Sequence, residues 1–389
     1  MPLRVLHLYA GNLYGGIERM LVTLAREHNA CPEMEPEFGL CFQGRLSQEL
    51  HECRASVHDL GAVRFSRPWT AIAARRRLRE LLRTSPFDVA ICHSNWPHSL
   101  FGAACNAAGI PLVYWAHDVP SGKHWTEWMA RLTLPRLAIA NSTFTASQLQ
   151  RLFNGVPSAV VPPPVPDMAL RTAHHDRSAL RRAYDVAPDE TLIAQASRLD
   201  EGKGHEVLIE ALARLPADLR WRCLISAVPQ RPQDHERLRA IDRLIHARAL
   251  GQRVKLLQQL PDVAALFAVA DVYCQPNLRP EGFGLTFVEA MYCAIPVVTS
   301  NIGGGAEVVD SSCGILTEPR DVAAIASALD RLVRDPSLRS RLGQNGRGRA
   351  AQLCEPSRVL RRLHEVLSKV AHGSVKADEV PTSAGAVSA

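Results

Sequence analysis

The sequence predicts an α/β fold in which two doubly wound parallel sheets form two successive domains. Short apolar runs alternate with helical stretches from the first residues onward, which is the pattern of β-α-β units. The alternation stops at a proline cluster within residues 162–166 and then starts again. A chain of 389 residues is also too long for one ordinary core.

The first domain is expected over residues 1–166. Its predicted strands are apolar runs bounded by turn residues, namely Arg4–Ala10, Phe38–Phe42, Asp88–His93, Pro111–His117, Leu137–Asn141 and Ala159–Pro162. The prolines that follow cannot lie inside a sheet, because proline has no amide hydrogen to donate. We therefore interpret them as a stiff linker that marks the domain boundary.

The second domain is expected over residues 167–355. Its predicted strands are Thr191–Ser197, Arg222–Ala227, Val254–Leu257, Asp271–Gln275 and Pro296–Ser300. Ligands of doubly wound sheets bind at the carboxyl ends of the strands, so two such domains predict a cleft between them.

The end of the chain divides into a helix and a tail. An apolar stripe predicts a helix within residues 356–372, formed by Leu360, Leu363, Leu367 and Val370. Residues 373–389 are small and polar without periodicity, which predicts a disordered tail.

Composition narrows the class of protein. The apolar fraction of 47% is typical of a globular protein. No basic segment followed by a long apolar run is apparent at the N-terminus, and the ten cysteines are scattered without metal-like spacing, so we expect a cytoplasmic protein. The net charge of +6 suits anionic substrates or a lipid surface, and no zinc knuckle or basic-aromatic pattern indicates nucleic acid.

The most informative segment is Arg279–Met291, which contains two glutamates around a glycine turn. The turn at Gly284 precedes a predicted helix whose first amides, near Leu285 and Thr286, have no intrahelical partner and can bind phosphate. Carboxylates cannot bind phosphate, but Glu281 and Glu289 can accept hydrogen bonds from hydroxyls. A ligand with both phosphates and hydroxyls is a nucleotide sugar. A glutamate in the second turn of a helix is, by itself, more often a solvated residue.

Two cations follow the first strand of the second domain. Arg198 and Lys203 lie in a glycine-containing loop, where they can neutralise a diphosphate. Taken alone, they would be ordinary solvated loop charges.

The first domain holds further candidates. Gly15 and Gly16 follow its first strand, either as a loop that lets phosphate approach or as a plain turn. The next glutamate, Glu18, either faces an acceptor or caps the helix. His117 ends a strand, where a histidine is commonly structural, and His93 and His98 lie near another strand end.

Four blocks together resemble the retaining nucleotide-sugar glycosyltransferases of family 4. They are residues 15–19, 116–118, 197–204 and 280–309, in the family's order. The resemblance implies the GT-B fold of two Rossmann-like domains, with the NDP-sugar donor in the second domain and a glycan or lipid-linked acceptor mainly in the first.

The resemblance also implies roles for the candidate residues. Arg198 and Lys203 would meet the leaving diphosphate, Glu281 the sugar, Glu289 the ribose, and His117 the donor sugar from the first domain. No metal and no cofactor beyond the nucleotide sugar is expected, since no D-x-D motif occurs. A nucleotide-sugar epimerase, a sugar phosphorylase or a non-catalytic binding protein of the same fold stays open, because fold does not determine function.

A basic helix is predicted over residues 66–83. Its apolar residues at Ala71, Ala74, Leu78, Leu81 and Leu82 lie on one side. Arg76, Arg79 and Arg83 lie on another side and are called the basic stripe below. The stripe is either a solvated face or a patch that meets anionic lipid headgroups at the inner face of a membrane.

Overall fold

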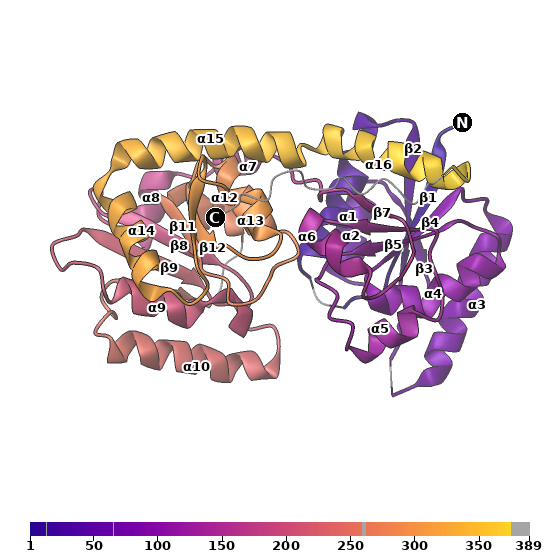
Figure 1. Ribbon diagram of the computed structural model, residues 1–389, viewed down its shortest axis with the longest axis horizontal. Helices are drawn as coiled ribbons and strands as arrows, with labels where there is room; N and C mark the ends of the chain where they lie inside the picture. Colours follow the sequence, from indigo (N-terminus) through magenta and orange to yellow (C-terminus); the bar gives the residue numbers. More distant parts are fainter. Residues whose placement is uncertain (13, 65, 259–261, 375–389) are drawn as a thin grey trace. The chain divides into compact units, whose positions relative to one another are not determined.

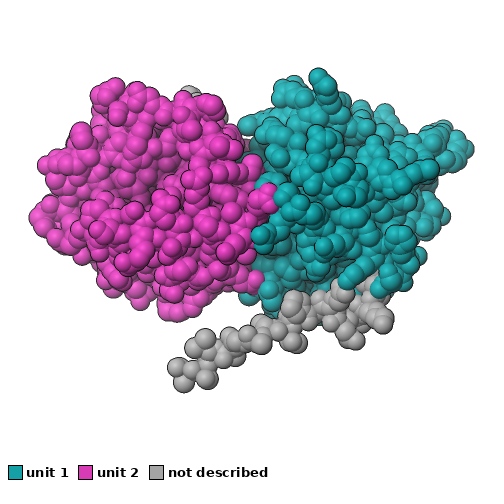
Figure 2. Space-filling view, turned by 90° about the horizontal axis from the view of Figure 1, so that it is seen from above, with its two compact units in different colours: residues 1–164, 356–389 teal, residues 165–355 magenta. Residues whose placement is uncertain are grey.

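The computed structural model describes residues 1–12, 14–64, 66–258 and 262–374 (Figure 1). The chain divides into two compact units (Figure 2). Unit 1 comprises Met1–Pro164 together with the chain from Pro356 onward, and unit 2 comprises Val165–Glu355. The division falls after Pro164, whereas the sequence analysis placed it after residue 166. The predicted tail lies outside the described residues from residue 375 onward.

The described part of unit 1 contains a parallel sheet of seven strands in the order β3-β2-β1-β4-β5-β6-β7. The strands are β1 Leu3–Tyr9, β2 Met34–Leu40, β3 Ser56–Asp59, β4 Val89–His93, β5 Leu112–Ala116, β6 Leu137–Ala140 and β7 Ser158–Val160. The α-helices are α1 Gly16–Arg26, α2 Arg45–Glu52, α3 Pro68–Thr84, α4 Asn95–Ala107, α5 Trp125–Ala130, α6 Thr143–Leu149 and α16 Pro356–Ala371, and a 3-10 turn covers His28–Ala30. The strand order reverses between β1 and β4, which in doubly wound sheets is where ligands bind.

The described part of unit 2 contains a second parallel sheet, of six strands in the order β10-β9-β8-β11-β12-β13. The strands are β8 Thr191–Ala196, β9 Trp221–Ser226, β10 Val254–Leu257, β11 Val272–Gln275, β12 Val297–Ser300 and β13 Gly314–Thr317. The α-helices are α7 Met168–Thr172, α8 Arg177–Ala183, α9 His205–Leu212, α10 Pro232–Ala247, α11 Val263–Val269, α12 Leu285–Tyr292, α13 Gly305–Val308, α14 Val322–Arg334 and α15 Pro336–Cys354, and a 3-10 turn covers Glu201–Lys203. Its order reverses between β8 and β11.

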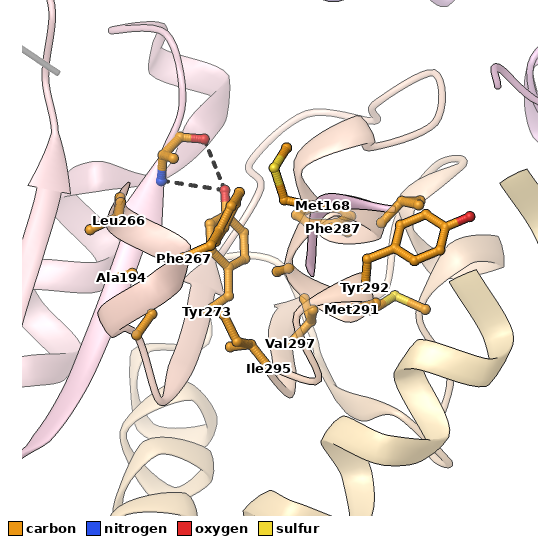
Figure 3. Packing of buried hydrophobic residues seen from close by; sticks show 14 of the residues in the cluster. Met168, Ala194, Leu266, Phe267, Tyr273, Phe287, Met291, Tyr292, Ile295 and Val297 are labelled. Atoms are coloured by element: carbon orange, nitrogen blue, oxygen red, sulfur yellow. Dashed lines mark hydrogen bonds between the residues drawn. The ribbon is translucent and has the colours of Figure 1, made fainter. Parts of the chain in front are cut away.

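Helices cover both faces of each sheet, so the central strands are apolar on both sides. In unit 2, Tyr273 of β11 faces one core with Phe267 and Phe287, and its neighbours Val272 and Cys274 face the other. Figure 3 shows the first core, with dashed lines for the two hydrogen bonds that join the Tyr273 hydroxyl to the backbone of residue 196. This buried anchor holds β11 against β8 beneath the site described below.

Two strands were missed in the sequence analysis, β3 and β13. Both have four residues and lie at a sheet edge. The sequence of β3, Ser-Val-His-Asp, leaves all four side chains partly or fully exposed and lacks an apolar run. Edge strands bury less surface than central ones, so they need no strong apolar pattern.

Several other predictions have a clear outcome. The proline cluster forms no helix or strand. All ten cysteines are free thiols. Helix α16 buries its predicted stripe in the core of unit 1, beside Val5 and Trp115. Helix α3 buries Ala74 and Leu78 and leaves the basic stripe exposed. Within the described ranges, no helix is both long and apolar enough to cross a membrane.

Candidate active site

The predicted site residues of unit 2 lie at the carboxyl edge of its sheet, on both sides of the reversal in strand order. Arg198 and Lys203 follow β8, and Glu281 follows β11. Strands β8 and β11 are direct neighbours, paired at Ile193 with Val272. Side chains that are 78 positions apart in the sequence thereby meet at one point.

Glu281 is the centre of a polar network at this edge. Its Oε1 accepts a hydrogen bond from Lys203 Nζ at 2.6 Å, and its Oε2 accepts from Asn277 Nδ2 at 2.8 Å and Gln275 Nε2 at 3.2 Å. The Tyr273 hydroxyl lies 2.9 Å both from Gln275 Oε1 and from the Ala196 carbonyl oxygen, and these two acceptors share its single proton. The carboxylate is therefore oriented from two sides, and the side chains of Lys203 and Glu281 are only 18% and 20% exposed.

The backbone of the two loops explains how they reach each other. Gly204 has a φ of +68°, and a Cβ at this position would lie 1.9 Å from the carbonyl oxygen of Pro276. Only glycine permits this approach. The amide of Leu278 also donates to the Gly202 carbonyl at 2.8 Å. The loop after β8 is thus attached to the loop after β11, and this attachment positions Lys203.

Asp200 lies in the loop after β8, and its carboxylate is close to two cations of that loop and to one cation of the loop after β11. Burial alone would raise the pKa of Asp200, but the Gly202 amide and the charges of Arg198, Lys203 and Arg279 hold that pKa below its usual value. The Arg198 side chain is exposed, and Arg279 pairs with Glu201 at 3.3 Å on the surface. Asp200, Glu201 and Glu281 balance these three cations in number, and the exposed Arg198 side chain is accessible to an anionic ligand.

Helix α12 begins where the sequence analysis placed it. Gly284 precedes it with a φ of +103°, a left-handed conformation that favours glycine. Leu285 and Thr286, its first two residues, are half-buried, and Leu285 packs against the core. Glu289, one turn further on, is 5% exposed. The helix start thus offers its free amides at the sheet edge where Glu281 lies.

Gly15 and Gly16 lie at the start of α1 in unit 1. The Gly15 amide donates to Glu18 Oε2 at 2.8 Å, and the Tyr9 hydroxyl donates to the other oxygen of the same carboxylate. Glu18 therefore caps the helix. A Cβ at Gly15 would meet no atom closer than Glu18 Oε2, at 3.6 Å. A Cβ would fit at ordinary contact distance, so the packing of the chain does not require glycine here.

His117 follows β5 and is the end of a row of three histidines, called the histidine chain below. His7 Nδ1 lies 3.0 Å from His93 Nε2, and His93 Nδ1 lies 2.9 Å from His117 Nε2. Burial lowers the pKa of His7 and of His117 to about 3. Burial, together with the neighbouring His117 and His7, also holds the pKa of His93 well below its usual value. All three imidazoles are therefore neutral at pH 7.

His98 does not join this chain. It lies on α4 and binds the carbonyl oxygen of Thr133 at 2.7 Å. His98 is completely buried, and burial lowers its pKa to about 4, partly offset by that hydrogen bond.

Sequence reasoning missed four residues of these networks: Gln275, Asn277, Arg279 and His7. A signal for three of them was present. Gln275 and His7 are polar side chains inside apolar strand patterns, and Asn277 follows such a strand directly. A buried polar side chain normally requires a partner, so each could have been marked as part of a network. Arg279 had no such signal, since its role depends on the loop geometry.

Two family models match the chain. Residues 14–167 match the model described as Glycosyltransferase Family 4, and residues 176–349 match the one described as Glycosyl transferases group 1. The two matches cover most of unit 1 and nearly all of unit 2.

Curated relatives agree with these models. A D-inositol 3-phosphate glycosyltransferase of Actinosynnema mirum is 30% identical over 300 residues, which cover 70% of this chain and 71% of the relative. The human alpha-1,3/1,6-mannosyltransferase is 25% identical over 260 residues, covering 63% of this chain and 61% of that protein. A GDP-mannose-dependent mannosyltransferase of Corynebacterium glutamicum is 31% identical over 180 residues, covering 44% and 45%.

Solved structures share the arrangement of both units. The Anabaena protein HepE, in complex with UDP and glucose, superposes with a TM-score of 0.81 at 24% identity, covering 94% of this chain and 100% of that one. A sucrose-phosphate synthase of Thermosynechococcus elongatus superposes with a TM-score of 0.76 at 19% identity, covering 96% and 100%. These likenesses establish the two-domain GT-B fold. With both family models and a relative of 30% identity in agreement, the chain belongs to the glycosyltransferases of family 4.

Proposed function

We propose that this glycosyltransferase moves a sugar from a nucleoside diphosphate sugar to a glycan or lipid-linked acceptor, with retention of the anomeric configuration and without a metal ion. One observation carries the proposal. The Glu281 carboxylate is held by Lys203, Gln275 and Asn277 beside the loop that carries the exposed Arg198. This arrangement supports a site in which a carboxylate accepts hydrogen bonds from sugar hydroxyls and the neighbouring cations bind phosphates.

In this proposal, unit 2 binds the donor. The leaving diphosphate is met by Arg198, Lys203 and the free amides at Gly284–Thr286, so that preorganised charge stabilises the departing group. The Lys203 ammonium has three N–H donors and uses one on Glu281, so it can bind a phosphate oxygen at the same time. Glu281 receives sugar hydroxyls near the reacting carbon, and Glu289 receives the ribose.

Unit 1 contributes two contacts to donor binding and supplies most of the acceptor site. His117 contacts the donor sugar, and the Gly15–Gly16 loop approaches the phosphates. The second role is compatible with the packing of the chain, which does not itself require glycine at Gly15. The neutral state of His117 suits a hydrogen bond to a hydroxyl better than a contact with a charged group.

The relatives guide the choice of donor. One is named as GDP-mannose-dependent, and HepE is described in complex with UDP and with UDP-glucose. The donor panel for this protein therefore includes UDP- and GDP-linked hexoses. Both fit a site that recognises a diphosphate and hydroxyls, which are common to the whole panel.

We also propose a peripheral contact with the inner face of an anionic membrane, through which unit 1 reaches a lipid-linked acceptor. The basic stripe of α3 is exposed. In the same unit, α5 and the following loop expose Trp128 (59%), Leu132 (84%) and Leu134 (59%). Helices α3 and α5 both pack against α4 (Figure 1). Exposed tryptophan and leucine beside arginine are typical of surfaces that enter the headgroup region.

Product analysis tests the reaction. The purified protein is incubated with each donor of the panel and with a lipid or glycan extract, with and without EDTA, and the products are identified by mass spectrometry. We expect a glycosylated acceptor, free nucleoside diphosphate and equal yield with EDTA. Interconversion of nucleotide sugars without an acceptor would identify an epimerase, and release of sugar phosphate in inorganic phosphate would identify a phosphorylase. Binding of the donor without turnover would identify a binding protein.

A further inference from the structure

The histidine chain follows a diagonal across the sheet of unit 1. His7 lies opposite Ile91 in the pairing of β1 with β4, and His93 lies opposite Trp115 in the pairing of β4 with β5. Each histidine is therefore two residues further toward the carboxyl edge than the one before. The rings are nearly parallel, with interplanar angles of 20° and 23°, and lie edge to edge at centroid distances of 5.2 and 5.1 Å. His7 and His93 are completely buried, whereas His117 is half-buried at the edge.

Two hydrogen bonds between three neutral imidazoles allow only two arrangements of protons. A neutral imidazole has one N–H, and each N···N contact requires one. Either His7 and His93 donate from Nδ1, so that His117 accepts at Nε2 and carries its own proton on Nδ1, or every proton lies on Nε2. The arrangement at one end of the chain thus determines the tautomer at the other.

The surroundings of His7, at the buried end of the histidine chain, decide between these two arrangements of protons. His7 Nε2 is buried and has no hydrogen-bond partner among the described residues. The second arrangement would place an N–H there without an acceptor, and buried orphan N–H groups are rare. The His7 ring stacks on Phe38 at an interplanar angle of 22°, so an in-plane N–H could not point at that ring's face. The first arrangement leaves only a lone pair in this position.

We propose that His7 and His93 are positioning residues that fix His117 in the Nδ1–H tautomer, so that its outer nitrogen is a hydrogen-bond donor. The described part of the chain offers no partner for His117 Nδ1. This N–H is available to a ligand oxygen, either a sugar hydroxyl or a phosphate oxygen, and it cannot accept a proton or a hydrogen bond. The inference deepens the proposed contact between His117 and the donor sugar, and rests on it for its catalytic consequence.

The tautomer itself can be measured without any enzyme activity. The full chain is labelled with ¹⁵N-histidine, and long-range ¹H–¹⁵N correlation spectra are recorded at pH 7, with His117 assigned from the His117→Phe variant. We expect a protonated Nδ1 and a bare Nε2 on His117. An Nε2–H tautomer, or an imidazolium ion, overturns the proposal. If the protein shows the expected tautomer but turns over no donor, the proposed function is disproved and the tautomer proposal stands.

Kinetics of three variants test the positioning role. His93→Phe keeps an aromatic ring but removes both nitrogens, and we expect kcat to fall about tenfold, the lower end of losses known for groups that orient a functional imidazole. The affinity for free UDP or GDP stays unchanged. His93→Asn places an amide near the former Nδ1, where it can donate to His117, and recovers most of kcat.

The matched control is His98→Phe, which makes the same change at a buried histidine of unit 1 outside the chain. It should lower stability, because His98 loses its bond to Thr133, but leave kcat unchanged. Wild-type kcat in His93→Phe overturns the proposal. So does an equal loss in His93→Asn and His93→Phe, or in His98→Phe and His93→Phe, because either result means that the loss comes from packing.

Discussion

Removal of the Lys203 charge is the most direct test of the proposed donor site. Lys203→Met keeps most of the length and apolar surface of a side chain that is 18% exposed, but deletes its ammonium group, which lies 2.6 Å from Glu281 Oε1. Hydrogen bonds to charged groups contribute about 1.5–3 kcal/mol. If Lys203 binds the diphosphate, the variant's Kd for UDP or GDP should rise between about tenfold and about 150-fold.

The same substitution also leaves the Glu281 carboxylate without its cation, so a second background separates the two effects. Isothermal titration calorimetry is performed on wild type, Lys203→Met, Glu281→Gln and the double variant. We expect Lys203→Met to weaken binding by a similar factor with Glu281 and with Gln at that position. A loss that disappears in the Glu281→Gln background means that Lys203 acts only by neutralising Glu281.

A surface lysine of the same unit provides the matched control. Lys255 pairs with Asp185 at 3.4 Å, and both side chains are at least half exposed. Exposed pairs contribute little, about 0–1 kcal/mol, so Lys255→Met should bind nucleotide like the wild type. A Kd of Lys203→Met within twofold of the wild-type value refutes the assignment of Lys203 to the phosphate site.

Three further predictions concern the glutamates, the membrane and pH. Glu281→Gln should lower kcat more than it weakens the binding of free nucleoside diphosphate. Glu289→Gln should weaken the binding of both the donor and the free nucleotide. Equal losses of nucleotide affinity in the two variants contradict the separate roles. Anionic vesicles should sediment more protein than neutral ones at low salt. High salt, or glutamine at all three positions of the basic stripe, should abolish the difference, because each arginine contributes about 1 kcal/mol and is screened over about 8–10 Å; equal sedimentation at low salt contradicts a membrane contact. The buried His98 has its pKa lowered from 6.5 to about 4, so the unfolded chain binds more protons between these values and the free energy of unfolding falls as pH drops through this window. Urea unfolding at several pH values should show a shallower decline in His98→Phe, by at most about 1.4 kcal/mol per pH unit, and an unchanged slope contradicts the buried neutral state.

The sequence by itself determined the fold class and the position of the loops that form the proposed donor site. Central parallel strands are buried on both faces, so they appear as apolar runs that can be recognised one by one. The glycine turn before α12 is equally local, because a left-handed residue and the helix after it are specified by adjacent positions. The edge strand β3 lacks this signal, since its four side chains are half-buried or exposed, whereas β13 is a short run of only four residues whose side chains are half-buried or buried.

Only the tertiary structure decided which side chains meet. Lys203 and Glu281 looked like separate residues with separate roles, and they form one ion pair because β8 and β11 are neighbours in the sheet. His7, His93 and His117 lie on three strands whose order and register bring their rings into one chain. Such contacts depend on strand order and on a register of single residues, and neither is written in the local pattern of any one strand. Local patterns therefore indicate where a loop or strand lies, and the packing of the sheet determines the chemistry of its edge.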